Sequence, residues 1–127
     1  MNTNIIKGKR FLIVDDSPDN IESLTLILEE EDAVIVGVAD PFEALKLASD
    51  SHFDILLLDA RMPGMTGREL LDAIRAIGVT TPAFALSADG STQASQNALN
   101  SGFARYFAKP YDIDEFLDTL RAYFNAS

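Results

Sequence analysis

Apolar residues along the chain switch between short continuous blocks and longer amphipathic stretches, and this switch repeats five times. The short blocks are continuously apolar rather than alternating, which predicts strands that are covered on both faces, as in a parallel sheet. Such strands are expected at residues 11–14, 34–38, 55–58, 82–86 and 104–107. The stretches that follow them carry apolar residues on one helical face and predict helices at residues 16–31, 41–48, 70–77, 92–101 and 113–124.

Five strand–helix alternations indicate an α/β fold, in which helices cover both faces of a five-stranded parallel sheet as a doubly wound three-layer sandwich. No internal repeat, low-complexity tract or linker breaks the pattern. A single domain is therefore expected over residues 9–127, preceded by a flexible leader at residues 1–8.

The composition excludes several classes of function. A chain of 127 residues, 47% of them hydrophobic, is long and apolar enough to bury one core. No apolar run approaches the ~20 residues of a membrane-spanning helix, and the N-terminus does not read as a secretory signal. The sequence has no cysteine, which excludes disulfides and thiolate sites and fits a cytoplasmic protein. A net charge of −10 repels nucleic acid, so direct DNA binding is not expected.

Polar residues stand where the predicted strands end, which is the edge at which open α/β sheets bind ligands. Asp15 and Asp16 follow the first strand, Asp59 the third, Ser87 the fourth and Lys109 the fifth. Three clustered carboxylates would raise one another's pKa, and a divalent cation would relieve their repulsion. Oxygen ligands with an incomplete shell suit Mg²⁺, which bridges readily to phosphate oxygens. With an ammonium and a hydroxyl beside it, a carboxylate here is a nucleophile prepared for phosphoryl transfer.

These motifs resemble the receiver domains of two-component response regulators. The resemblance covers about residues 9–124 and rests on Asp15-Asp16, on Asp59 within residues 56–67, on Ser87-Ala88 and on Lys109-Pro110. It implies a flavodoxin-like sandwich with strand order 2-1-3-4-5. It also implies a signalling switch that takes a phosphoryl group from a histidine kinase or a histidine phosphotransfer domain and catalyses only its own phosphorylation and dephosphorylation. The output would reach a downstream protein or fused domain through the face of helix four, strand five and helix five.

The resemblance also assigns roles at the acidic cluster. Asp59 is the implied phosphoacceptor. Asp16 and Asp59 would bind Mg²⁺ directly, together with the backbone carbonyl of Arg61. Asp15 would act mostly through water.

Three further residues complete the implied switch. Lys109 would hold the phosphoryl group, and Ser87 would turn inward to meet it. Tyr106 matches the aromatic residue whose rotation reports the state of Ser87. The Lys109–Pro110 bond resembles the cis peptide of the family, which the position before proline permits. Tyr111 stands where phenylalanine is commoner in the family.

A lid over the site is a separate hypothesis. Arg61 lies two residues beyond Asp59, and Asp89 lies two residues beyond Ser87, so both would rim the same pocket. Hydrolysis needs a water in line with the phosphorus–oxygen bond. A guanidinium above the phosphoryl group would hinder that water and slow autodephosphorylation, whereas side chains that point into solvent would have little effect.

Two other functions are weighed against the switch. A Mg²⁺-dependent phosphatase of the haloacid-dehalogenase type also uses an aspartate nucleophile, but it needs an Asp-x-Asp pair, and Ser17 stands two residues beyond Asp15. A nucleotide-binding domain is disfavoured because no glycine-rich phosphate motif is present. No output domain is expected in the 127 residues, and both a stand-alone regulator and a receiver from a hybrid kinase or longer regulator stay open.

Overall fold

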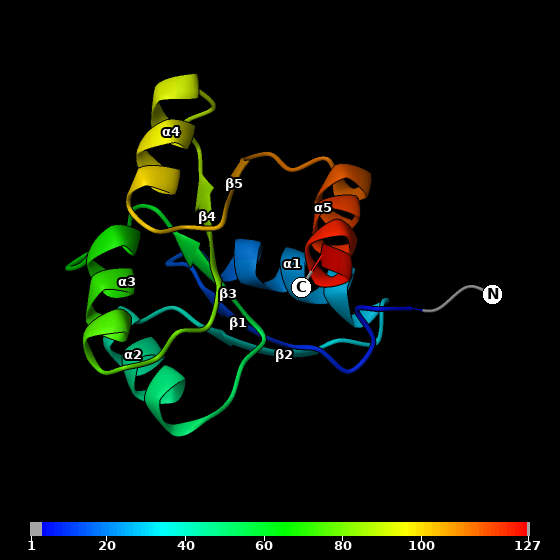
Figure 1. The fold of residues 1–127 in the computed structure, drawn as a ribbon, viewed down its shortest axis with the longest axis horizontal. Coiled ribbons are helices and arrows are strands. Elements are labelled where there is room, and N and C mark those ends of the chain that lie inside the picture. Colours follow the sequence, from blue (N-terminus) through cyan, green and yellow to red (C-terminus); the bar gives the residue numbers. More distant parts are fainter. Residues whose placement is uncertain (1–3, 127) are drawn as a thin grey trace.

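The computed structural model describes residues 4–126 and contains one five-stranded parallel sheet with helices on both faces (Figure 1). Its elements in chain order are β1 Arg10–Val14, α1 Pro18–Glu29, β2 Val34–Val38, α2 Pro41–Asp50, β3 Ile55–Asp59, α3 Gly67–Ala76, β4 Ala83–Ser87, α4 Thr92–Asn100, β5 Arg105–Ala108 and α5 Ile113–Ala126. The strand order β2-β1-β3-β4-β5 confirms the predicted doubly wound sandwich. None of the helices in the described part of the chain is long and apolar enough to cross a membrane.

The register of the sheet brings the carboxyl ends of its central strands to one edge. Val14 at the end of β1 pairs with Leu58 of β3, and Asp59 pairs with Leu86 of β4. Ser87 pairs with the last residue of β5. Residues that end or directly follow these strands therefore share one edge of the sheet.

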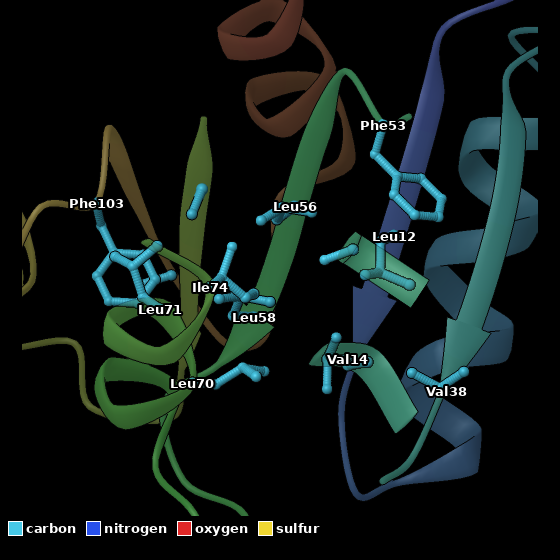
Figure 2. Packing of buried hydrophobic residues seen from close by; sticks show 14 of the residues in the cluster. Leu12, Val14, Val38, Phe53, Leu56, Leu58, Leu70, Leu71, Ile74 and Phe103 are labelled. Carbon is cyan, nitrogen blue, oxygen red and sulfur yellow. The ribbon is translucent and has the colours of Figure 1, made fainter. Parts of the chain in front are cut away.

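Two apolar clusters fill the space between the sheet and the helices. Consecutive strand residues point to opposite faces, so Leu56 and Leu58 join one cluster while Ile55 and Leu57 join the other. Figure 2 shows the first cluster, which packs the sheet against α2 and α3. The second cluster packs the opposite face against α1 and α5. Burial on both faces explains the apolar runs of the central strands β1, β3 and β4, whereas the edge strands β2 and β5 are mostly exposed or half-buried.

Helix α1 begins at Pro18, two residues later than the sequence pattern predicts. The side chain of Ser17 accepts a hydrogen bond from the backbone N–H of Asn20, which makes Ser17 the N-cap. Proline at the first helical position needs no hydrogen-bond partner for its nitrogen. Asp15 and Asp16 therefore lie in the loop between β1 and α1.

The sequence predicts a flexible leader at residues 1–8, but the structure shows residues 4–8 in contact with the domain. Residues 1–3 lie outside the described residues, but Ile6 is fully buried in the cluster beneath α1 and α5. The side chain of Asn4 donates to the carbonyl of Glu31 at 2.9 Å, and Gly8 donates from its backbone to the carbonyl of Asp32 at 2.9 Å. Residues 4–8 thus pack against the domain instead of forming a loose leader.

Candidate functional site

Three carboxylates meet at the edge of the sheet where β1 and β3 end. One oxygen from each of Asp15, Asp16 and Asp59 lies within 4.8 Å of the others. Asp15 is fully buried and Asp59 is 6% exposed, whereas Asp16 is exposed to solvent. The parallel register explains the meeting, because Val14 of β1 pairs with Leu58 of β3, so Asp15 and Asp59 both come next at the same edge.

Asp15 is held mainly by protein donors. Its Oδ1 accepts the backbone N–H of Ser17 at 2.9 Å, and its Oδ2 accepts the side-chain amide of Asn20 at 3.4 Å. The ammonium of Lys109 also donates to Oδ2, at 2.9 Å. A buried carboxylate with several donors is fixed in place, which leaves the exposed Asp16 freer to meet a solvent-borne ligand.

Lys109 bridges two of the three carboxylates. It follows β5, precedes a cis bond to Pro110, and donates from Nζ to Asp15 at 2.9 Å and to Asp59 at 3.2 Å. Burial alone would lower the pKa of Lys109, but the hydrogen bonds and charges of Asp15 and Asp59 outweigh it and raise the pKa. The ammonium therefore keeps its charge inside the pocket.

The pKa of Asp59 is raised, whereas a carboxylate paired with an ammonium usually has a lowered pKa. Burial is the largest influence and, with the charge of Asp15, raises the pKa of Asp59 from 3.8 to about 6. Lys109 opposes this rise without cancelling it, and contact with Asp16 adds to it. A buried carboxylate beside two others thus favours any ligand that supplies further positive charge.

A pocket of ≈ 400 Å³ opens beside Asp59. Its lining residues are Asp59, Arg61, Ser87, Ala88, Asp89 and Lys109. The pocket therefore joins the end of β3, the loop after β4 and the residue after β5, which are the places from which the sequence predicted the site.

Ser87 and Tyr106 are linked through the loop after β4. The hydroxyl oxygen of Ser87 accepts the backbone N–H of Asp89 at 3.1 Å, which leaves the hydroxyl proton for another acceptor. The hydroxyl of Tyr106 donates to the backbone carbonyl of Asp89. A displacement of this loop would therefore change the hydrogen bonds of both side chains.

Arg61 and Asp89 both line the pocket, as the lid hypothesis requires. Hydrogen bonds from Ser91 are the main cause that lowers the pKa of Asp89, and the charge of Arg61 adds to the effect. Within residues 4–126 the two side chains form no ion pair with each other. Their attraction therefore acts at longer range than a direct contact.

The site contains a polar group that sequence reasoning did not assign. The hydroxyl of Tyr111 is buried and has no hydrogen-bond partner among the described protein groups. Burial, followed by the charges of Asp15 and Asp59, raises the pKa of Tyr111. The unusual tyrosine after Lys109-Pro110 was the available signal, but the sequence does not reveal that its hydroxyl is buried.

The donor set suits a hard divalent cation. Carboxylate oxygens are the ligands that Mg²⁺ prefers, and a site with few protein ligands leaves room for water and phosphate oxygens. Asp16 is exposed and Asp59 lines the pocket, so both can offer such oxygens to a ligand, while Asp15 is occupied by protein donors. The residues present therefore fit Mg²⁺.

Comparison with known proteins gives a consistent result. Residues 11–121 match the family described as response regulator receiver domain. An uncharacterized 14.6 kDa protein of Leptolyngbya boryana is 38% identical over 88% of this chain and 87% of its own. The transcriptional regulatory protein TcrA of Mycobacterium tuberculosis is 32% identical over 92% of this chain, which spans 46% of TcrA. The sensor histidine kinase RcsC of Escherichia coli is 34% identical over 88% of this chain, which spans 12% of that kinase.

A solved structure supports the same relationship. The receiver domain of a sensor histidine kinase from Pseudomonas aeruginosa PAO1 superimposes with a TM-score of 0.83 at 28% identity, covering 93% of this chain and 98% of that one. That structure is described with a magnesium ion coordinated in its active site cleft.

Proposed function

Because this chain belongs to the response regulator receiver domain family of two-component systems, we propose that it works as a switch phosphorylated on Asp59. The observation that carries the proposal is the ammonium of Lys109, which lies 3.2 Å from a carboxylate oxygen of Asp59 in the lining of the pocket. This places positive charge beside the only one of the three carboxylates that also lines that pocket. The rival phosphatase of the haloacid-dehalogenase type gains no support, because the relatives are receivers of regulators and kinases.

The chemical step follows from these positions. A carboxylate oxygen of Asp59 attacks the phosphorus atom of a phosphohistidine in a histidine kinase or phosphotransfer domain, and a new phosphorus–oxygen bond forms. The phosphorus–nitrogen bond breaks, and its electron pair stays on the imidazole nitrogen of the donor. Lys109 neutralises charge on the transferred oxygens, and the hydroxyl of Ser87 donates a hydrogen bond to one of them.

Asp16, Asp59 and the backbone carbonyl of Arg61 are the groups that we propose to hold Mg²⁺, with Asp15 acting through water. Bound Mg²⁺ supplies positive charge that stabilises the phosphoryl oxygens during transfer. Asp15 contributes by anchoring Lys109, since the ammonium donates to it at 2.9 Å.

The output would leave through the face of α4, β5 and α5. The phosphoryl group carries a charge of about −1.5 to −2 and takes the place of the single negative charge of the Asp59 carboxylate. Ser87 would turn toward that charge and release the N–H of Asp89, whose carbonyl is held by Tyr106. None of the residues of α4 is buried, whereas α3 buries four residues. A displacement of α4 would therefore cost less free energy than a displacement of α3. A downstream protein or a fused output domain would read the new surface, acting in the cytoplasm.

Mass spectrometry after incubation with acetyl phosphate and MgCl₂ tests the proposal. The parent should gain one labile phosphoryl group, and Asp59→Asn should gain none. Asp72→Asn removes an exposed carboxylate from α3 and should be labelled like the parent. Labelling of Asp59→Asn at the parent level would exclude Asp59 as the acceptor. Steady release of phosphate over many turnovers would favour a phosphatase instead.

A further inference from the structure

The first residue of α3 packs directly against the backbone of Asp59. Gly67 is the first residue of α3 and is buried. A Cβ added to it would overlap the carbonyl oxygen of Asp59 and lie 3.1 Å from the carbonyl carbon of that residue and 3.2 Å from the Cα of Ala60. These are backbone atoms, which cannot rotate aside as a side chain could. Gly67 is needed here for space, because a helical first residue does not require the left-handed backbone region.

Backbone hydrogen bonds complete the contact. Gly67 donates from its N–H to the carbonyl of Ala60 at 3.0 Å, and Ala60 donates from its N–H to the carbonyl of Leu86 in β4 at 2.7 Å. Ala60, the residue after Asp59, is therefore held by β4 through its N–H and by α3 through its carbonyl.

The start of α3 is itself well fixed. Thr66 donates from its backbone to the side chain of Glu69 at 2.9 Å, and the backbone of Glu69 donates to the hydroxyl of Thr66 at 3.1 Å. This capping box defines where the helix begins. Any displacement of the capped end would be passed to the residue that Gly67 touches.

We propose that Gly67 is a positioning residue of the phosphorylation site, an inference that rests on the proposed role of Asp59. The missing side chain lets the capped end of α3 sit against the Asp59 backbone. That contact sets where the Asp59 carboxylate and the carbonyl of Arg61 lie relative to Asp16. Mg²⁺ accepts only small departures from octahedral geometry, so a displaced backbone would weaken its binding.

Among the seven glycines, which all lie in the described residues, Gly67 alone would direct an added Cβ against backbone. Gly37 provides a matched control. Its added Cβ would overlap a side-chain methyl group of Ile21, in edge strand β2. Gly67→Ala and Gly37→Ala therefore insert the same methyl group into a tight contact, but only the first contact involves the site.

The experiment compares Mg²⁺ affinity in the two variants, from amide chemical shifts of residues 59–61 during a MgCl₂ titration, with melting temperatures measured alongside. Gly67→Ala should weaken Mg²⁺ binding about tenfold or more, the usual effect of disturbing groups behind metal ligands. Its labelling by acetyl phosphate should slow in parallel. Gly37→Ala should lose thermal stability but keep the parent's Mg²⁺ affinity. Unchanged affinity and labelling in Gly67→Ala would overturn the proposal.

A measurement on the parent covers the case in which Gly67→Ala does not fold. On adding MgCl₂, the amide proton of Gly67 should shift more than that of Gly78, which donates to the carbonyl of Arg75 at the far end of α3. A Gly67 amide that shifts no more than Gly78 would contradict the coupling. Failure of the parent to be labelled on Asp59 would refute the proposed function. A labelled parent with normal Gly67→Ala would refute only the role of Gly67.

Discussion

Replacing Asp59 by asparagine should make the protein more stable at neutral pH, although the variant loses the proposed acceptor. Asp59 is 6% exposed, and burial together with the charge of Asp15 raises the pKa of its carboxyl group to about 6. Above that pH the carboxyl group is ionised in the folded protein, and this lowers the free energy of unfolding. Asparagine has nearly the same shape and carries no charge. Lys109 retains Asp15 as its partner at 2.9 Å, so the substitution leaves no unpaired ammonium.

The size of the effect follows from the pKa. The rise from 3.8 to about 6, at about 1.4 kcal/mol for each pKa unit, corresponds to about 3 kcal/mol at pH 7. Between these two pH values the folded state keeps a proton that the unfolded state has released. The stability of the parent therefore falls as pH rises through this window and stays lower above it. The advantage of Asp59→Asn should be near zero at pH 3.5, grow through the window, and be largest above pH 6.

Urea denaturation followed by circular dichroism, which suits a chain without tryptophan, measures this difference at pH 3.5, 5 and 7. Asp59→Asn should gain up to about 3 kcal/mol in free energy of unfolding at pH 7, or on the order of 10 °C in melting temperature. The exposed control Asp72→Asn should gain little at any pH. MgCl₂ should stabilise the parent more than Asp59→Asn, because ligand binding to the folded state adds stability.

The reasoning would be refuted if Asp59→Asn were no more stable than the parent at pH 7. A gain of equal size at pH 3.5 and pH 7 would also contradict it, because it would not arise from ionisation. Either result would mean that Lys109 fully compensates the buried charge of Asp59, so that burial would not raise the pKa of this carboxyl group.

Three further predictions concern neighbouring side chains. Tyr111→Phe should raise the free energy of unfolding by about 1 kcal/mol in urea denaturation, because it removes a buried hydroxyl without a protein partner; a loss of stability would mean that the hydroxyl is satisfied. Asp16→Ala should lose most Mg²⁺ affinity in a chemical-shift titration, and EDTA should stop labelling of the parent; labelling that is insensitive to EDTA would contradict the metal role. Arg61→Ala and Asp89→Ala should both lose the phosphoryl group faster than the parent, and equal decay in all three proteins would exclude the lid.

The sheet could be predicted from sequence because its signal is local. Residues 55–58 are all apolar, and a strand with both faces covered is the arrangement that buries every one of them. The start of α1 could not be placed this way. Helical spacing includes Asp16, but the helix begins after Ser17, because Ser17 caps it and also donates its N–H to Asp15. Those hydrogen bonds depend on positions that periodicity does not encode.

Ile6 shows a second limit. Ile5 and Ile6 are an isolated apolar pair ahead of the first strand, with no repeat from which to infer a face. Burial of Ile6 depends on the space between the sheet and helices α1 and α5, which come from distant parts of the chain. Short segments at an end of a domain are therefore poorly predicted from sequence, even when they belong to the core.

The convergence of the site residues could be predicted, but the balance of forces among them could not. Parallel strands in known order bring Asp15, Asp59 and Lys109 to one edge, and this needs no coordinates. Coordinates are needed, however, to tell which carboxylate lies closer to the ammonium of Lys109. Its ammonium lies 2.9 Å from Asp15 and 3.2 Å from Asp59, and only Asp15 is fully buried. In the proposed reaction, Asp59 gives up the charge of its attacking oxygen when the phosphoryl bond forms. The shorter contact to Asp15 does not involve that oxygen, so it would keep the ammonium beside the transferred group after the reaction.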